Sequence, residues 1–374
     1  MPRAIKLAAI QMNAEPAPTD ARLARAAALV AQAAQEGAQV VVLPEVFNTG
    51  YEYSDANYTR AEPIDGPTVT WMKRAAQQHD VYLAGTLLLL DTEDIYNAMV
   101  LVGPAGQLWR YDKAYPWAWE RAYFREGGRI TVADTPLGKF GMLVCWDSAH
   151  PNLWARYAGK VDAMLVCSCP PTMHDLTLVF PDGERLRASG ISPLHRQMQR
   201  SSAETFGALL RRQAAALGVP VVNTTGTGLF SSPAPLPQVS LVTYTLGRPD
   251  LWRYVPEAGA IMVEAGYFQQ TYVADAGGHV LAQVPAGAEH GVVAEVTLPD
   301  TLPQPDKPQP RSGVSPFAYM LDEFANAMLR PVYRQAVRRV YGAQMAPVAA
   351  GTGRWAFATL LAGVLGFLVA RRRR

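Results

Sequence analysis

Cysteine is scarce in this chain, with three residues among 374. Small disulfide-stapled domains are dense in cysteine, so this scarcity excludes that class and favours a reducing compartment. Charged residues are also few, at 18%, but apolar residues reach 49%, which excludes an intrinsically disordered or collagen-like chain. The sequence has no P-loop, no dinucleotide-binding glycine fingerprint and no G-x-S-x-G elbow, and its six histidines show no zinc-ligand spacing. Nucleotide-, dinucleotide- and zinc-dependent activities therefore find no support in the sequence.

The small net charge of +2 hides an uneven distribution along the chain. Residues 301–374 carry 11 Lys or Arg and 3 Asp or Glu, a net charge of +8, so residues 1–300 carry −6. A mildly acidic body does not attract the phosphate backbone of nucleic acids. We therefore expect no nucleic-acid partner, and the basic tail needs an explanation of its own.

The tail contains one long apolar run, from Trp355 to Ala370, without a charged residue. As a helix it would reach about 24 Å, slightly short of a hydrocarbon core of roughly 30 Å, and the flanking arginines can snorkel to cover the difference. Small residues recur at every fourth position of one face, a spacing that lets membrane helices pack closely. The pattern predicts a membrane anchor over residues 354–374, spanning or monotopic, with its orientation open. The alternative is a buried helix of a soluble domain.

Two segments join the body to this tail. Residues 301–312 are proline-rich and predict a semi-rigid linker. Residues 313–343 combine helical apolar spacing with several arginines, and Pro331 is expected to kink or split the helix. Such a segment could lie on an anionic lipid surface, or pack on the body or on a partner subunit. No secretory signal peptide is recognisable at the N-terminus, so we expect a membrane-associated protein with its body in the cytoplasm.

Residues 1–300 alternate strand-like and helix-like patterns, which favours one layered α/β domain. Strands are expected at residues 5–11, 39–43, 81–90, 96–102, 139–145, 161–167, 219–223 and 292–298, with a hairpin across 271–284. Helices are expected at residues 20–36, 67–79, 152–157 and 201–217. The long stretches 170–200 and 231–270 break this rhythm. We expect them to be loops that form substrate walls, because long loops usually serve as lids or binding loops.

Three chemically capable side chains stand at or just past the ends of predicted strands. Glu45 follows a buried apolar run, Lys113 comes just after the strand and turn that end near Trp109, and Cys145 ends the strand over residues 139–145. Open α/β sheets bind their ligands at the carboxyl ends of strands. Alone, such a cysteine is more often a buried small hydrophobe, and a lone Glu or Lys is usually a solvated charge; together they indicate a site. Cys167 and Cys169 are interpreted as structural.

The context of these residues resembles the nitrilase superfamily of carbon–nitrogen hydrolases. The matching motifs are Leu43-Pro44-Glu45, then Tyr111-Asp112-Lys113, then Gly141-Met142-Leu143-Val144-Cys145-Trp146-Asp147. Each motif is weak alone, but their order is that of the family, and the resemblance extends over roughly residues 4–300. It implies a four-layer α-β-β-α sandwich that is usually dimeric or larger.

The same resemblance implies a catalytic triad of Glu45, Lys113 and Cys145 that needs no metal or cofactor. Cys145 would attack the carbon of a small-molecule amide or nitrile, while Glu45 accepts its proton and later activates water. Lys113 would stabilise the developing anion together with the backbone N–H of Trp146, a residue that also positions the substrate. The predicted function is therefore a membrane-tethered thiol hydrolase that cleaves a non-peptide C–N bond through a thioester.

Members of the family often have a second glutamate after the lysine. Glu120 is the candidate, with the role of positioning the substrate and Lys113, and Glu126 is the alternate. True nitrilases tend to have Cys-Trp-Glu where this chain has Cys-Trp-Asp, so amide and nitrile substrates both stay open. Two other functions stay open as well: an acyltransferase that passes the same thioester to an amine, and a non-catalytic membrane assembly protein.

Overall fold

The computed structural model describes residues 3–172, 175–191, 204–245, 247–305 and 308–342. The predicted membrane anchor, residues 354–374, lies outside these ranges. Among the helices within them, none is long and apolar enough to cross a membrane.

Two large β-sheets form the centre of the molecule. The first has the order β12-β1-β2-β3-β4-β5, and β17 also pairs with β1, antiparallel to it. Its strands are β1 (Arg3–Asn13), β2 (Val40–Val42), β3 (Tyr82–Asp91), β4 (Asp94–Val102), β5 (Leu108–Asp112), β12 (Gly226–Thr227) and β17 (His290–Leu298). The second has the order β16-β15-β11-β8-β7-β6. Its strands are β6 (Val132–Thr135), β7 (Gly138–Val144), β8 (Ala163–Cys167), β11 (Val221–Thr224), β15 (Tyr272–Ala274) and β16 (Val280–Gln283).

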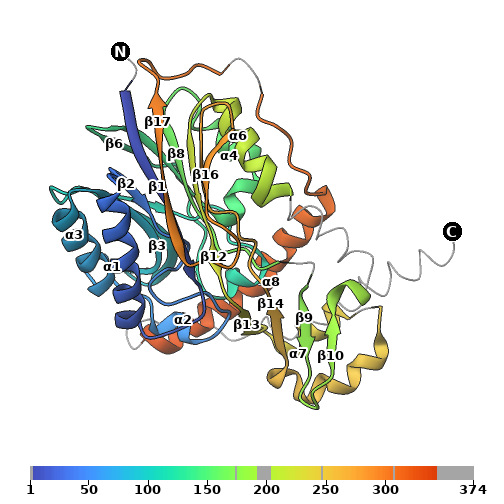
Figure 1. Ribbon diagram of the computed structural model, residues 1–374. Helices are drawn as coiled ribbons and strands as arrows, with labels where there is room; N and C mark the ends of the chain where they lie inside the picture. Colours follow the sequence, from blue (N-terminus) through green and yellow to red (C-terminus); the bar gives the residue numbers. More distant parts are fainter. Residues whose placement is uncertain (1–2, 173–174, 192–203, 246, 306–307, 343–374) are drawn as a thin grey trace.

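Helices cover the outer face of each sheet, so the layers run α-β-β-α (Figure 1). α1 (Thr19–Gln35) and α3 (Pro67–His79) lie on the first sheet, and α4 (Pro151–Ala155) and α6 (Leu210–Leu217) on the second. A π-helical turn, η4 (Thr205–Leu209), leads into α6. This arrangement confirms the predicted sandwich, and it explains why the strand sequences are continuous apolar runs: most central strands are buried on both faces.

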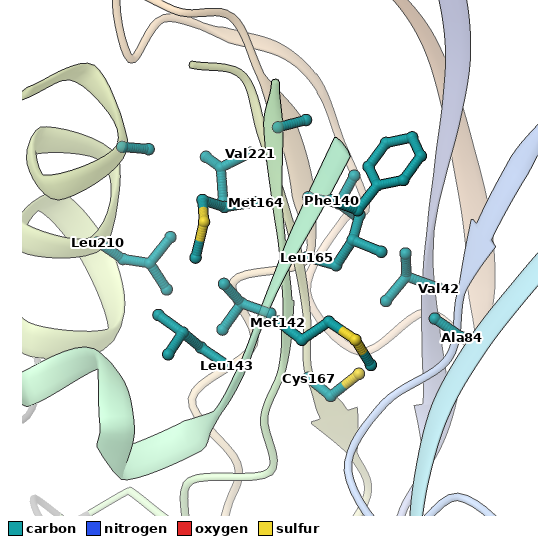
Figure 2. Packing of buried hydrophobic residues seen from close by; sticks show 14 of the residues in the cluster. Val42, Ala84, Phe140, Met142, Leu143, Met164, Leu165, Cys167, Leu210 and Val221 are labelled. Carbon is teal, nitrogen blue, oxygen red and sulfur yellow. The ribbon is translucent and has the colours of Figure 1, made fainter. Parts of the chain in front are cut away.

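The hydrophobic core fills the space between the sheets and extends under the helices. Figure 2 shows Phe140 and Met142 of β7 pointing toward Val42 of β2, whereas Leu143 points the opposite way, toward Leu210 of α6. Successive side chains of a strand face opposite sides, so one strand contributes to both the inter-sheet layer and the helix layer. The strand that ends in the predicted nucleophile is thereby fixed on both faces.

The stretches 170–200 and 231–270, expected to be loops, instead build most of a third sheet of four strands, in the order β10-β9-β14-β13. The strands are β9 (Thr177–Val179), β10 (Arg185–Arg187), β13 (Phe230–Pro233) and β14 (Met262–Ala265), accompanied by η3 (Ala188–Gly190), α7 (Pro237–Tyr244) and η5 (Pro249–Ala260). This small sheet projects beside the sandwich (Figure 1). Its strands are only three or four residues long, and β9 pairs with β14 far along the chain, so no local pattern could reveal them.

The C-terminal helix α8 (Pro316–Tyr341) runs unbroken through Pro331, so of the two outcomes expected there, a kink or a split, the helix is not split. Packing on the body holds the residues after the proline: Tyr333, Ala336 and Val337 are buried. The Tyr333 hydroxyl accepts a bond from the Ile95 N–H (2.8 Å). Of the locations left open for this segment, the structure therefore has it packed on the body, next to the short α2 (Ala56–Thr59) and η1 (Ala118–Ala122).

Candidate active site

The ends of three strands bring the predicted triad together. Glu45 lies just after β2, Lys113 directly after β5, and Cys145 directly after β7, where it begins η2 (Cys145–Ala149). All three side chains are buried, with Cys145 only 4% exposed. The backbone of Cys145 has φ of +51°, a left-handed conformation that is strained for a residue with a side chain. Such strain is typical of nucleophiles held on a sharp turn.

Lys113 is the centre of the site. Its Nζ lies 2.8 Å from Glu45 Oε1, and 2.8 and 2.7 Å from the two carboxylate oxygens of Glu120. These three side chains are at most 1% exposed, so the ammonium exchanges its hydration for two carboxylates. Glu120, rather than the alternate Glu126, is therefore the second glutamate that contacts Lys113.

Neighbouring groups fix both carboxylates. Glu45 accepts bonds from Asn97 Nδ2 (2.8 Å) and from the backbone N–H of Cys169 (2.9 Å). Glu120 accepts a bond from the Tyr51 hydroxyl (2.6 Å). Sequence reasoning missed Tyr51 and Asn97, and it treated Cys169 as structural without foreseeing the role of its backbone. The one available signal was Asn97, a polar residue inside the apolar strand β4.

Burial and charge set the protonation of the triad. Burial raises the pKa of Glu45, an effect that the Lys113 ammonium opposes. Burial opposes the charge of Lys113, but Glu120 and Glu45 together raise its pKa well above the ordinary value. Burial and the Glu45 carboxylate raise the pKa of Cys145 well above that of a free thiol. The resting thiol is therefore protonated, and it interacts with the carboxylate of Glu45, which is placed to take the proton.

Asp147 stands at the position where true nitrilases tend to have the glutamate of Cys-Trp-Glu. Its side chain fixes the turn that carries Cys145. Its carboxylate accepts bonds from the Val144 N–H (3.0 Å), the Tyr111 hydroxyl (2.7 Å) and the Tyr115 N–H (2.8 Å). Burial raises the pKa of Asp147 to about 6. The side chain thus ties the turn after β7 to the segment that follows Lys113, and it does not line the pocket.

Cys145 lines a pocket of about 520 Å³, its open mouth included. Aromatic and aliphatic side chains surround it, from segments that follow strands of the two large sheets, from η4 and from the small sheet, so the segments expected as substrate walls do contribute to it. The lining residues are Tyr51, Tyr53, Trp117, Trp119, Cys145, Trp146, Pro170, Pro171, Leu176, Phe206, Phe230 and Val263. No charged side chain is among these lining residues of the described part of the chain. Trp146, predicted to position the substrate, lines this pocket, and its Nε1 has no hydrogen-bond partner among the described residues.

Comparison with known proteins places this chain in a family. The family model for carbon–nitrogen hydrolases matches residues 6–303. A nitrilase of Pyrococcus abyssi is 32% identical over 207 residues, 54% of this chain and 76% of that protein. An omega-amidase of Xenopus laevis is 32% identical over 178 residues, 43% of this chain and 62% of its own length.

A solved structure supports the same conclusion at the level of the fold. The crystal structure of an amidase from Nesterenkonia sp. superposes with a TM-score of 0.56 at 17% identity, over 81% of this chain and 93% of that one.

Among the described residues, no cluster of His, Cys, Asp and Glu could hold a metal ion. The chain belongs to the carbon–nitrogen hydrolase family, with the nitrilase-type α/β sandwich, and is an enzyme of that class.

Proposed function

We propose that this protein is a thiol hydrolase that cleaves the C–N bond of an uncharged amide or nitrile through a thioester on Cys145. The observation that carries the proposal is the buried Glu45–Lys113–Glu120 cluster beside a protonated cysteine, Cys145, that lines an apolar pocket. A buried ammonium between two carboxylates adds little stability to a fold, but it provides fixed charge for a reaction.

In the first half-reaction the Cys145 sulfur bonds to the carbonyl carbon while the thiol proton passes to Glu45. Lys113 and the backbone N–H of Trp146 stabilise the oxyanion. Glu45 then returns the proton to the nitrogen, the C–N bond breaks, and ammonia or an amine leaves. With a nitrile, the adduct is a thioimidate; water adds to its carbon, ammonia departs, and the same thioester remains.

In the second half-reaction Glu45 takes a proton from water, and the hydroxide oxygen bonds to the thioester carbon. The C–S bond breaks, and the sulfur regains the proton as the carboxylic acid leaves. Glu120, held by the Tyr51 hydroxyl, keeps Lys113 in place in both halves.

The pocket favours an apolar acyl group. A substrate carboxylate would lose its hydration against aromatic rings, and Lys113, the cation that acts on the Cys145 thiol among the described residues, already binds two carboxylates. We expect aryl or alkyl acyl groups to be preferred over acyl groups that carry a charge.

We propose separately, from the sequence pattern and the family resemblance, where the enzyme works and how it assembles. Residues 354–374 tether a cytoplasmic catalytic domain to the membrane, and the protein assembles as a homodimer or larger homo-oligomer, as is usual for the family.

The test uses the full chain, purified in mild detergent, with matched aryl and carboxylate-bearing amides and nitriles. We expect ammonia release from the aryl compounds, its loss in Cys145→Ser, and near wild-type rates in Cys167→Ser, a control that alters a buried thiol outside the triad. Adding an amine acceptor separates hydrolysis from acyl transfer: an amide product in place of the acid would favour the acyltransferase. No turnover from any compound, with Cys145 inert to alkylation, would contradict the proposal.

A further inference from the structure

Helix α8 lies beyond residue 303, where the match to the hydrolase family ends, yet it contacts the segment that carries Glu120. We call residues 117–122 the Glu120 loop. Asp322 of α8 accepts a bond from the backbone N–H of Ala118 (2.7 Å) through Oδ1 and one from Arg121 Nη2 (3.0 Å) through Oδ2. Asp322 and Arg121 are 6% and 5% exposed, so this ion pair is excluded from solvent.

The backbone of the Glu120 loop depends on such outside contacts. Ala118 has φ of +36°, a conformation that residues with a Cβ rarely adopt and that persists only when the surroundings impose it. Within the loop, the Trp117 N–H bonds to Glu120 Oε2 (2.6 Å), so the loop conformation and the position of the carboxylate are coupled. The bond from the next N–H, that of Ala118, to Asp322 is the contact through which α8 fixes this conformation.

The same face of α8 also reaches the turn that carries the nucleophile. Tyr319 precedes Asp322 by three residues, so the two side chains share one helix face. The Tyr319 hydroxyl bonds to the Ala149 carbonyl, and its ring lies 5.2 Å from His150 and 6.4 Å from Trp146, measured between ring centroids. One helical turn therefore contacts both the Glu120 loop and the turn after Cys145.

We propose that Asp322 is a positioning residue of the active site, which holds the Glu120 loop so that Glu120 meets Lys113. The inference rests on the proposed function, because Glu120 matters only if Lys113 acts in the reaction. Removing the Asp322 carboxylate leaves the buried Arg121 guanidinium, one residue from Glu120, with only the exposed Glu323 carboxylate 3.8 Å away, and it frees the Ala118 N–H. Misplacement of a catalytic group by about 1 Å lowers the rate by about 100-fold.

Two variants of Asp322 separate the effect of its hydrogen bond to the Ala118 N–H from the effect of its charge on Arg121. Asp322→Leu removes both bonds, and Asp322→Asn keeps an oxygen that can accept from Ala118 but removes the charge that faces Arg121. Glu323→Gln is the matched control: it removes a neighbouring carboxylate that lies 3.8 Å from the same Arg121 Nη2 but is 67% exposed.

The measurements are kcat and KM of the full chain on an aryl amide, thermal stability, and hydrogen exchange of the peptide that contains residues 117–122. We expect Asp322→Leu to lower kcat by about 10- to 100-fold, with KM changed less than threefold, at temperatures where the variant is folded. The Asn variant should recover part of the loss, and Glu323→Gln should match wild type. Exchange over residues 117–122 should be faster in the Leu variant.

A Leu variant that loses thermal stability but keeps kcat and the wild-type exchange of residues 117–122 would overturn the inference. If the wild-type protein turns over no amide or nitrile, the proposed function fails, and the exchange measurement still decides whether Asp322 holds the Glu120 loop.

Discussion

Single residues at the site act through burial as much as through charge. Glu45, Lys113 and Cys145 are each withdrawn from water, and their protonation depends on one another. A protonated thiol beside a carboxylate avoids the cost of a permanent buried thiolate. The charge then develops only during the attack, where Lys113 is already in place.

Trp119 is expected to limit the length of the acyl group. It lines the main pocket and also a second pocket of about 290 Å³, which Tyr244, Leu241 and Ala258 help to line. Trp119→Ala should join the two spaces and raise kcat/KM for longer acyl chains relative to short ones, by about threefold to fourfold for each added methylene that becomes buried. The check is a chain-length series of amides. Leu241→Ala, which enlarges only the second pocket, should keep the wild-type preference, and an unchanged preference in Trp119→Ala would disprove this role.

His150 is expected to make the fold sensitive to acid. Its ring stacks on Tyr115, with centroids 3.6 Å apart, and burial lowers its pKa to about 4. The unfolded chain, with an ordinary histidine near pH 6.5, binds this proton first, so the contribution of His150 to stability is present above that pH and is lost as the pH falls toward 4. In His150→Phe, thermal stability should fall less between pH 6.5 and 4 than in wild type. Asp147 titrates in both proteins, so the difference between the two curves reports on His150; parallel curves would contradict the assignment.

At the scale of elements, the sequence predicts the features that depend on neighbouring residues. It does not predict those that depend on contacts between distant segments. The strands that end at Glu45 and Cys145 were predicted because a continuous apolar run followed by a polar residue is a local signal. Glu120 was predicted because the family resemblance implies a second glutamate after the lysine. Tyr51, Asn97 and Asp322 were missed because their roles arise only where distant segments meet, and the small sheet was missed because its short strands pair across long intervals.

Gly85 of β3 packs closely against the residues on either side of Glu45. A Cβ on Gly85 would lie 2.8 Å from the Phe47 ring and 3.2 Å from Leu43 Cβ. Gly85→Ala should therefore lower the free energy of unfolding by about 1–3 kcal/mol, as measured by denaturant titration. Gly128→Ala, where nothing lies within 4 Å of the added carbon, serves as the control. Equal stability of the two variants would show that this packing yields without cost.

At the scale of the whole molecule, the proposed anchor predicts that the enzyme works at a membrane. The full chain should sediment with membranes and stay there at high salt and in alkaline carbonate, whereas a chain that ends at residue 342 should be released. Release of the full chain by salt alone would show that its arginines bind lipid headgroups without an inserted helix, because salt screens surface charge and does not extract a buried apolar segment.

The measurement that tests the central claim most directly is the mass of the acyl-enzyme. Cleavage after Lys139 and Arg156 places Cys145 in a peptide of residues 140–156, whereas Cys167 and Cys169 fall together in residues 161–185. After rapid acid quenching of turnover on an aryl amide, we expect the mass of the acyl group on the first peptide alone, and its absence in Cys145→Ala. Continued turnover with an unmodified first peptide, or an acyl group on the second, would contradict a thioester on Cys145.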